Sequence, residues 1–180
     1  ADSFMSSLLD SRQIERVVRR MAGEIVGGDP RLEDVVLGGI RTRGVPLAEA
    51  IAAEIRRLEE VELPIGVLDI TLYRDDLSTI GPQAVVRDTR LPGSIDGKVL
   101  VLCDDVLYTG RTIRAALDAL IDYGRPEAVH LAVLVDRVGL RQLPIQADVV
   151  GQEAKTTLDQ TVRVQFESVD GVDSVEVVDR

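Results

Sequence analysis

The sequence predicts an α/β fold: a single doubly wound domain with a parallel central sheet flanked by helices, plus a flexible hood or β-arm. Three observations predict it. Apolar strand-like runs alternate with amphipathic helical stretches along the 180 residues. Residues 98–103 are apolar throughout after the first, which is typical of a strand covered on both faces. Residues 98–135 then give strand, helix and strand, the βαβ unit of a parallel sheet.

In chain order, the first expected element is a helix over residues 11–26. Apolar residues recur there at helical spacing and form one face, made of Ile14, Val17, Val18, Met21 and Ile25. Glycines and a proline directly after this segment end the helix. A short strand is expected at residues 35–40. A second helix is expected at 46–58, where Pro46 suits the first turn.

A strand at residues 65–72 leads into a polar excursion over 69–90, the expected hood or arm. A buried strand (98–103), a helix (111–123) and another buried strand (128–135) follow. Residues 161–166 and 174–178 alternate between apolar and polar side chains, which predicts a pair of edge strands. No internal repeat or linker divides the chain, so residues 1–180 are expected to form one domain.

The amino-acid composition limits the classes of protein to which the chain can belong. With 45% hydrophobic and 29% charged residues the chain is typical of soluble globular proteins. One cysteine cannot form an internal disulfide, and no apolar run approaches the ~20 residues of a membrane helix, so we expect a cytoplasmic protein with no membrane partner. The net charge of −10 disfavours indiscriminate binding of nucleic acid but leaves room for a local basic patch.

The most informative segment is the loop that follows the strand at 98–103. Asp104 and Asp105 come at the carboxyl end of that strand, where open α/β sheets bind ligands. Hydroxyls of Thr109 and Thr112, the flexible backbone of Gly110 and the start of a helix then suit a phosphate dianion. The carboxylates cannot face that phosphate, so they are placed for ribose hydroxyls or for a cation that forms on the sugar. The alternative is an ordinary tight turn with two acids near a helix N-terminus.

Three motifs resemble the pyrimidine operon attenuation protein (PyrR) family of type I phosphoribosyltransferases. They are residues 104–112 (Asp-Asp-Val-Leu-Tyr-Thr-Gly-Arg-Thr), 68–77 (Leu-Asp-Ile-Thr-Leu-Tyr-Arg-Asp-Asp-Leu) and 131–137 (Leu-Ala-Val-Leu-Val-Asp-Arg). The resemblance covers residues 14–166. It implies RNA binding controlled by uridine nucleotides (UMP, UTP), combined with transfer of uracil to phosphoribosyl pyrophosphate (PRPP). It also implies Mg²⁺ carried by PRPP with no direct protein ligand, and a homodimer or homotetramer.

The resemblance assigns roles to individual positions. It places PRPP or nucleotide on two loops, and the residues concerned are Arg41, Thr42, Arg43, Gly44, Asp104, Asp105, Val106, Leu107, Tyr108, Thr109, Gly110, Arg111 and Thr112. Asp104 and Asp105 would act in catalysis together with Arg74, which lies in the hood and would close on the pyrophosphate. Asp136, Arg137 and Val150 would border the base pocket. The alternative for residues 41–44 is an ordinary surface turn. The alternative for the segment around Arg74 is a polar hairpin tip.

The resemblance fails at positions that belong to the family's RNA face. One extra residue falls between 138 and 140, and Gly23, Leu140, Gln146 and Gln152 stand where the family has histidine or basic residues. A basic patch remains possible from Arg16, Arg19, Arg20, Arg141, Lys155 and Thr156, against the alternative of a solvated surface. Three functions therefore stay open: an mRNA leader-binding regulator with uracil phosphoribosyltransferase activity, a salvage enzyme without RNA binding, and a nucleotide sensor with little catalysis.

Overall fold

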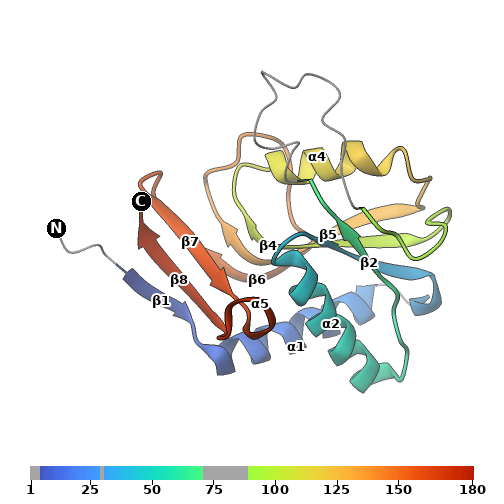
Figure 1. Cartoon of the computed structure of the whole chain (residues 1–180), viewed down its shortest axis with the longest axis horizontal. Helices are drawn as coiled ribbons and strands as arrows, with labels where there is room; N and C mark the ends of the chain where they lie inside the picture. Colours follow the sequence, from blue (N-terminus) through green and yellow to red (C-terminus); the bar gives the residue numbers. More distant parts are fainter. Residues whose placement is uncertain (1–4, 29–30, 71–88) are drawn as a thin grey trace.

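The computed structural model describes residues 5–28, 31–70 and 89–180, and its centre is a five-stranded parallel sheet (Figure 1). The strand order is β3-β2-β4-β5-β6, and each neighbouring pair runs parallel. The strands are β2 (Val35–Ile40), β3 (Ile65–Leu68), β4 (Val99–Leu107), β5 (Ala128–Arg137) and β6 (Val149–Ala154). The predicted parallel sheet is confirmed.

Helices cover both faces of this sheet. Helices α1 (Ser11–Gly28) and α2 (Gly44–Glu59) lie on one face, and α4 (Arg111–Leu120) lies on the other (Figure 1). A 3-10 turn, η1 (Leu32–Asp34), precedes β2. Alternate residues of β4 point to opposite cores: Val101 packs with the α1 and α2 residues, whereas Leu100 packs with Ile113 of α4. The doubly wound arrangement predicted from the apolar strands is therefore confirmed.

The strand order creates a topological switch point. After β2 the chain first adds β3 on one side and then crosses to add β4 on the other side of β2. Because the connections on the two sides leave in opposite directions, the loops after β2 and β4 separate and open a crevice at the carboxyl edge of the sheet. The two loops singled out in the sequence are those that follow β2 and β4.

A second, smaller sheet stands beside the carboxyl end of the first. It has the order β1-β8-β7, all antiparallel, and consists of β1 (Met5–Leu9), β7 (Gln160–Gln165) and β8 (Ser174–Asp179). A short helix, α5 (Glu167–Asp170), joins β7 to β8. Residues 161–166 and 174–178 do pair with each other, as expected. The expectation that they are edge strands of the main sheet is wrong. They form a separate sheet with residues near the N-terminus, and β6 is the edge strand instead.

Several expected boundaries also change. Strand β4 continues through both aspartates to Leu107, because β5 pairs with it as far as Leu107↔Asp136. Helix α4 ends at Leu120 and not at residue 123, shortly before Gly124 with its φ of 145°. Of the expected hood over residues 69–90, positions 71–88, Arg74 included, lie outside the described residues. Among the described helices, none is long and apolar enough to cross a membrane.

Candidate functional site

The loop after β2 and the end of β4 touch at the switch point. A Cβ atom placed on Gly44 would lie 2.3 Å from the carbonyl oxygen of Cys103 and 3.3 Å from the Cα of Asp104. Only glycine permits this approach, because a methyl group cannot come so near backbone atoms. The sequence assigned Gly44 to ligand binding. Its observed contacts show that it brings the start of α2 against the strand that carries the paired aspartates.

The paired aspartates hold their own backbone. The Oδ1 atom of Asp104 accepts a hydrogen bond of 2.9 Å from the Asp105 N–H, and Oδ1 of Asp105 accepts one of 2.9 Å from the Val106 N–H. Asp104 is buried at 7% exposure and Asp105 is half-buried. The preceding Cys103 is fully buried, and its burial, followed by the nearby charge of Asp104, raises the pKa of the thiol to about 12.

The turn from β4 into α4 has the shape that the Thr-Gly-x-Thr sequence predicts. Gly110 has a φ of 94° and precedes the first turn of α4, where its carbonyl accepts the Arg114 N–H at 3.0 Å. Thr109 Oγ1 accepts the Arg111 N–H at 3.3 Å. The Thr109 carbonyl in turn accepts the N–H groups of Gln142 and Leu143 at 2.9 and 3.2 Å. The segment after β5 thus supports this turn from behind.

A cavity of about 630 Å³ opens in front of this turn. All nine residues from Asp104 to Thr112 line it, so the structure brings the whole predicted phosphate loop together. The remaining lining residues are Ile113, Arg114, Ala115, Asp118, Arg137, Thr161, Val162 and Arg180. Four arginines and three aspartates therefore share one cavity of ligand size, an arrangement that suits a phosphorylated sugar with hydroxyl groups.

Arg137 is the most deeply buried charged residue of this cavity. It is 2% exposed, and its Nε donates to Thr156 Oγ1 at 2.8 Å while Nη2 donates to the carbonyls of Thr157 and Gln160 at 3.0 Å. Its guanidinium lies 4.1 Å from the centre of the Tyr108 ring. Burial lowers the pKa of Arg137 from its ordinary value. These are neutral acceptors, so within the described part of the chain no ion pair with a carboxylate holds the positive charge of Arg137 in place.

The other two residues expected at the base pocket are arranged differently. Asp136 is buried and its Oδ1 accepts a 2.6 Å hydrogen bond from Nη2 of Arg141, whose Nη1 donates to the Tyr108 carbonyl. Val150 lies in β6, half-buried against the core on the α4 face, and does not line the described cavity. Of the three, Arg137 alone lines the cavity.

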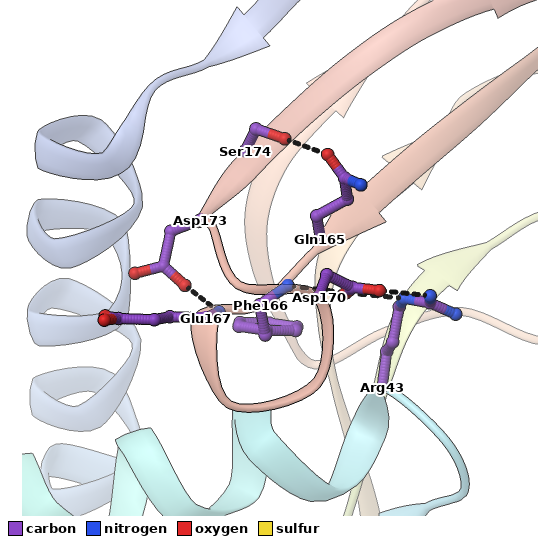
Figure 2. Close-up of polar contacts among 7 residues, drawn as sticks. All are labelled: Arg43, Gln165, Phe166, Glu167, Asp170, Asp173 and Ser174. Carbon is purple, nitrogen blue, oxygen red and sulfur yellow. Dashed lines mark hydrogen bonds and ion pairs between the residues drawn. The ribbon is translucent and has the colours of Figure 1, made fainter.

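The loop after β2 carries two arginines, each paired with a carboxylate. Arg41 Nη1 lies 3.8 Å from Asp69 Oδ2, and the Arg41–Thr42 peptide bond is cis. Arg43 forms a bidentate pair with Asp170 of α5 (Figure 2). A second cavity of about 370 Å³ lies between this loop, the first turns of α2 and α5, and is lined by Arg41, Thr42, Val45, Pro46, Glu49, Ser168 and Val169.

The expected RNA-face residues differ in the contacts that they make within the molecule. Arg20 donates to the carbonyls of Val150 and Gly151 and pairs with Glu24 at 2.9 Å. Arg19 pairs with Glu15 at 2.7 Å and lies 3.6 Å from Glu54. As described above, Arg141 supports the phosphate loop and Thr156 bonds to Arg137.

Four cations of this set are exposed, and Arg19 and Arg20 are the two that carry the ion pairs given above. Arg16 and Lys155 are exposed and form no ion pair with another described residue. The basic patch therefore stays a prediction, with Arg19 and Arg20 paired to glutamates and Arg16 and Lys155 forming no ion pair with a described residue.

Sequence reasoning missed the contribution of the small sheet. Thr161, Val162 and Arg180 line the main cavity, and Asp170 holds Arg43. No local signal marks these positions, because their role depends on a pairing between β1 and β8 at opposite ends of the described chain. The alternation over residues 161–166 was visible, but the place where that strand docks was not.

Comparison with known proteins gives independent information on the family of this chain. Residues 5–169 match the model of the phosphoribosyl transferase domain. The protein named Bifunctional protein PyrR from Thermus thermophilus is 54% identical over 177 residues, which cover 98% of this chain and 97% of that relative. Proteins of the same name from Chloroflexus aurantiacus and Deinococcus radiodurans are 54% and 50% identical, over 95% and 97% of this chain and 93% and 94% of theirs.

Solved structures agree in fold. A mutant hypoxanthine phosphoribosyltransferase from Trypanosoma cruzi, in a ternary substrates complex, superposes with a TM-score of 0.75 at 18% identity. The match covers 100% of this chain and 96% of that one. Another structure of the enzyme named hypoxanthine phosphoribosyltransferase from the same organism gives 0.73 at 16% identity, covering 97% and 96%. At these identities the likeness concerns the fold alone.

Proposed function

Because the chain belongs to the phosphoribosyl transferase family, and within it to the bifunctional PyrR proteins, we propose that it makes UMP from uracil and PRPP and regulates pyrimidine genes by binding mRNA leader stem-loops. The observation that carries the enzymatic half is the meeting of two loops at the switch point. The end of β4 holds the paired aspartates ahead of the turn into α4, and the loop after β2 holds two arginines.

In this reaction the N1 atom of uracil forms a bond to C1′ of the ribose. The bond from C1′ to the pyrophosphate oxygen breaks, pyrophosphate leaves with the electron pair, and N1 loses its proton. Positive charge develops on the sugar in the transition state. Asp104 and Asp105 are positioned to accept hydrogen bonds from ribose hydroxyls and to stabilise that charge, while the 5′-phosphate lies on the turn around Gly110.

The leaving group needs cations on its other side. We assign that role to Arg41 and Arg43 of the loop after β2, together with Arg74. The Mg²⁺ that PRPP carries would neutralise charge on the diphosphate. Adjacent Asp104 and Asp105 are hard oxygen acceptors that can receive hydrogen bonds from the water ligands such an ion retains.

The enzymatic half has a direct test. Labelled uracil, PRPP and Mg²⁺ should yield labelled UMP with the wild-type protein. The variant Asp104→Asn should be slower by at least ~100-fold, the scale of one lost electrostatic contact in a transition state. Its folding should survive, because Asn retains an oxygen that can accept the Asp105 N–H. Wild-type turnover in this variant would contradict the assignment of the ribose to Asp104.

A second candidate function, a uracil salvage enzyme without RNA regulation, is favoured by the placement of the RNA-face residues. Arg20, Arg141 and Thr156 bond within the molecule, so fewer of their polar atoms are left for RNA. Binding of a pyrimidine-leader stem-loop at several salt concentrations, with and without UMP or UTP, separates the two. Specific, nucleotide-dependent binding supports the regulator, and its absence at physiological salt leaves the salvage enzyme.

We also propose that the protein acts in the cytoplasm as a homodimer or homotetramer. Nascent mRNA and PRPP meet in that compartment, and the single cysteine is buried and reduced. Sedimentation equilibrium of the purified chain measures the assembly directly.

A further inference from the structure

The connection between β7 and β8 supplies a carboxylate to the loop after β2. The Oδ1 atom of Asp170 lies 2.8 Å from Nη2 of Arg43, and Oδ2 lies 3.2 Å from Nε of Arg43 (Figure 2). Asp170 is 13% exposed and Arg43 36% exposed at the side chain. A residue 127 positions further along the chain thus determines where a proposed pyrophosphate-binding arginine lies.

Asp170 is itself held in place by its own turn. Its Oδ2 accepts a 2.9 Å hydrogen bond from the N–H of Phe166, whose side chain is buried in the core. In the same turn Asp173 accepts the Glu167 N–H at 2.8 Å, and Ser174 donates to Gln165 at 3.0 Å (Figure 2). These contacts do not involve Arg43. The Phe166 N–H therefore holds the Asp170 carboxylate, and the other two contacts hold its turn, without help from Arg43.

The geometry of the pair leaves part of the guanidinium available. Arginine presents five N–H donors on a planar fork, and a carboxylate bound to Nε and Nη2 occupies one edge. The second edge, formed by Nη1 and the remaining Nη2 hydrogen, can still pair with a phosphate in the same bidentate manner. The hydrogen bond to Asp170 raises the pKa of Arg43, and the charge of Asp105 makes a smaller contribution in the same direction.

We propose that Asp170 is a positioning residue for the departing pyrophosphate: it holds Arg43 by the Nε edge and leaves the Nη1–Nη2 edge for the phosphate oxygens. This inference rests on the proposed transferase function. Its energetic basis is preorganisation, because a long side chain that is already ordered loses less conformational freedom when the ligand arrives. Asp170 acts through Arg43 and is not expected to touch the substrate.

The test compares two variants of the same turn. In Asp170→Asn the amide oxygen can replace Oδ2 and still accept the Phe166 N–H and Arg43 Nε, but the amino group then faces Nη2 and the charged bidentate pair is lost. The matched control is Asp173→Asn, which removes the same charge from the same turn without a contact to Arg43. Calorimetry with Mg²⁺-pyrophosphate and with UMP, and the KM for PRPP, are measured for both, alongside melting temperature.

We expect Asp170→Asn to weaken pyrophosphate binding and raise the KM for PRPP by about five- to tenfold, the effect of one side chain that must be ordered on binding. UMP affinity should stay at the wild-type value, because UMP carries no pyrophosphate. Asp173→Asn should leave all three quantities unchanged. In an Arg43→Gln background, Asp170→Asn should have no further effect on pyrophosphate affinity, since its action passes through Arg43.

Three results would overturn the inference: unchanged pyrophosphate affinity in Asp170→Asn, tighter binding, or an equal loss of UMP and pyrophosphate affinity. Tighter binding would mean that Asp170 withdraws Arg43 from the ligand, and an equal loss would mean a purely structural role. If Asp170→Asn unfolds at the assay temperature, Asp170→Glu moves the charge by one methylene and is judged by the same comparison. A wild-type protein that binds neither PRPP nor pyrophosphate contradicts the proposed function itself.

Discussion

Replacement of Gly44 by alanine tests whether the close approach between α2 and β4 matters for chemistry. The new methyl carbon would lie 2.3 Å from the Cys103 carbonyl oxygen, whereas a carbon and an oxygen at ordinary contact are about 3.3 Å apart. The obstacle is backbone on both sides, so no side chain can rotate away. The start of α2 must therefore move from β4 by about 1 Å, the difference between those two distances.

That movement carries the Arg41–Gly44 loop away from Asp104. A 1 Å misplacement of a catalytic group can cost about 100-fold in rate, so we expect UMP synthesis to fall by about that factor. Overpacking of this kind costs about 1–3 kcal/mol, which for a chain of this size lowers the melting temperature by about 2–12 °C. UMP affinity should change little, because the nucleotide phosphate is assigned to the turn at Gly110 on the other loop.

Steady-state turnover with labelled uracil, thermal unfolding and UMP calorimetry measure the three quantities. Gly23→Ala is the matched control, since a Cβ at Gly23 meets nothing within 4 Å and alanine favours the helix by about 0.5–1 kcal/mol. That variant should melt slightly higher and turn over normally. Gly44→Ala with wild-type turnover would show that the loop after β2 does not take part in the transfer.

Three further variants and one labelling reaction probe other parts of the molecule. In Gly110→Val a β-branched residue must adopt a φ of 94°, and its Cβ would lie 3.1 Å from Ile145; UMP binding by calorimetry should be lost while the protein remains folded. Cys103, whose thiol pKa is raised to about 12, should stay protonated and resist a thiol reagent at about pH 8 until the protein is unfolded, and fast native labelling would contradict its burial. Arg16→Gln should reduce the salt dependence of any RNA binding by about 0.7–0.9 in log–log slope at unchanged melting temperature. Arg20→Gln should lower the melting temperature and leave the salt dependence unchanged, because Arg20 donates to carbonyls of β6.

Much of the fold follows from local patterns. Continuous apolar strands and the helices between them predicted the parallel, doubly wound sheet, which the structure confirms. The three motifs predicted the PyrR family, which relatives at about half identity confirm. The phosphate loop could be predicted because its chemistry lies within nine consecutive residues, and the structure places all nine along one cavity.

The remaining features depend on contacts between distant segments. The alternation of residues 161–166 predicts a strand but not its neighbours, and pairing of Met5 with Val178 cannot be seen from either segment alone. A run of arginines on α1 indicates a basic surface, yet Arg20 bonds to backbone carbonyls of β6 and Arg19 to two glutamates. Local patterns report which residues are charged. They do not report which charges are already neutralised by a partner far away in the sequence.

The β1–β8 pairing also has a consequence for the order in which the molecule is assembled during synthesis. All strands of the central sheet have been made once β6 is complete, so this sheet can pair before β8 exists. The small sheet must wait for β8, and with it come the turn that carries Asp170 and the wall of the main cavity formed by Thr161 and Val162. A nascent chain would therefore possess a folded phosphate loop before it possesses the partner of Arg43. Ligand binding by such a chain would precede its competence in transfer, and the last strand to emerge would complete the site.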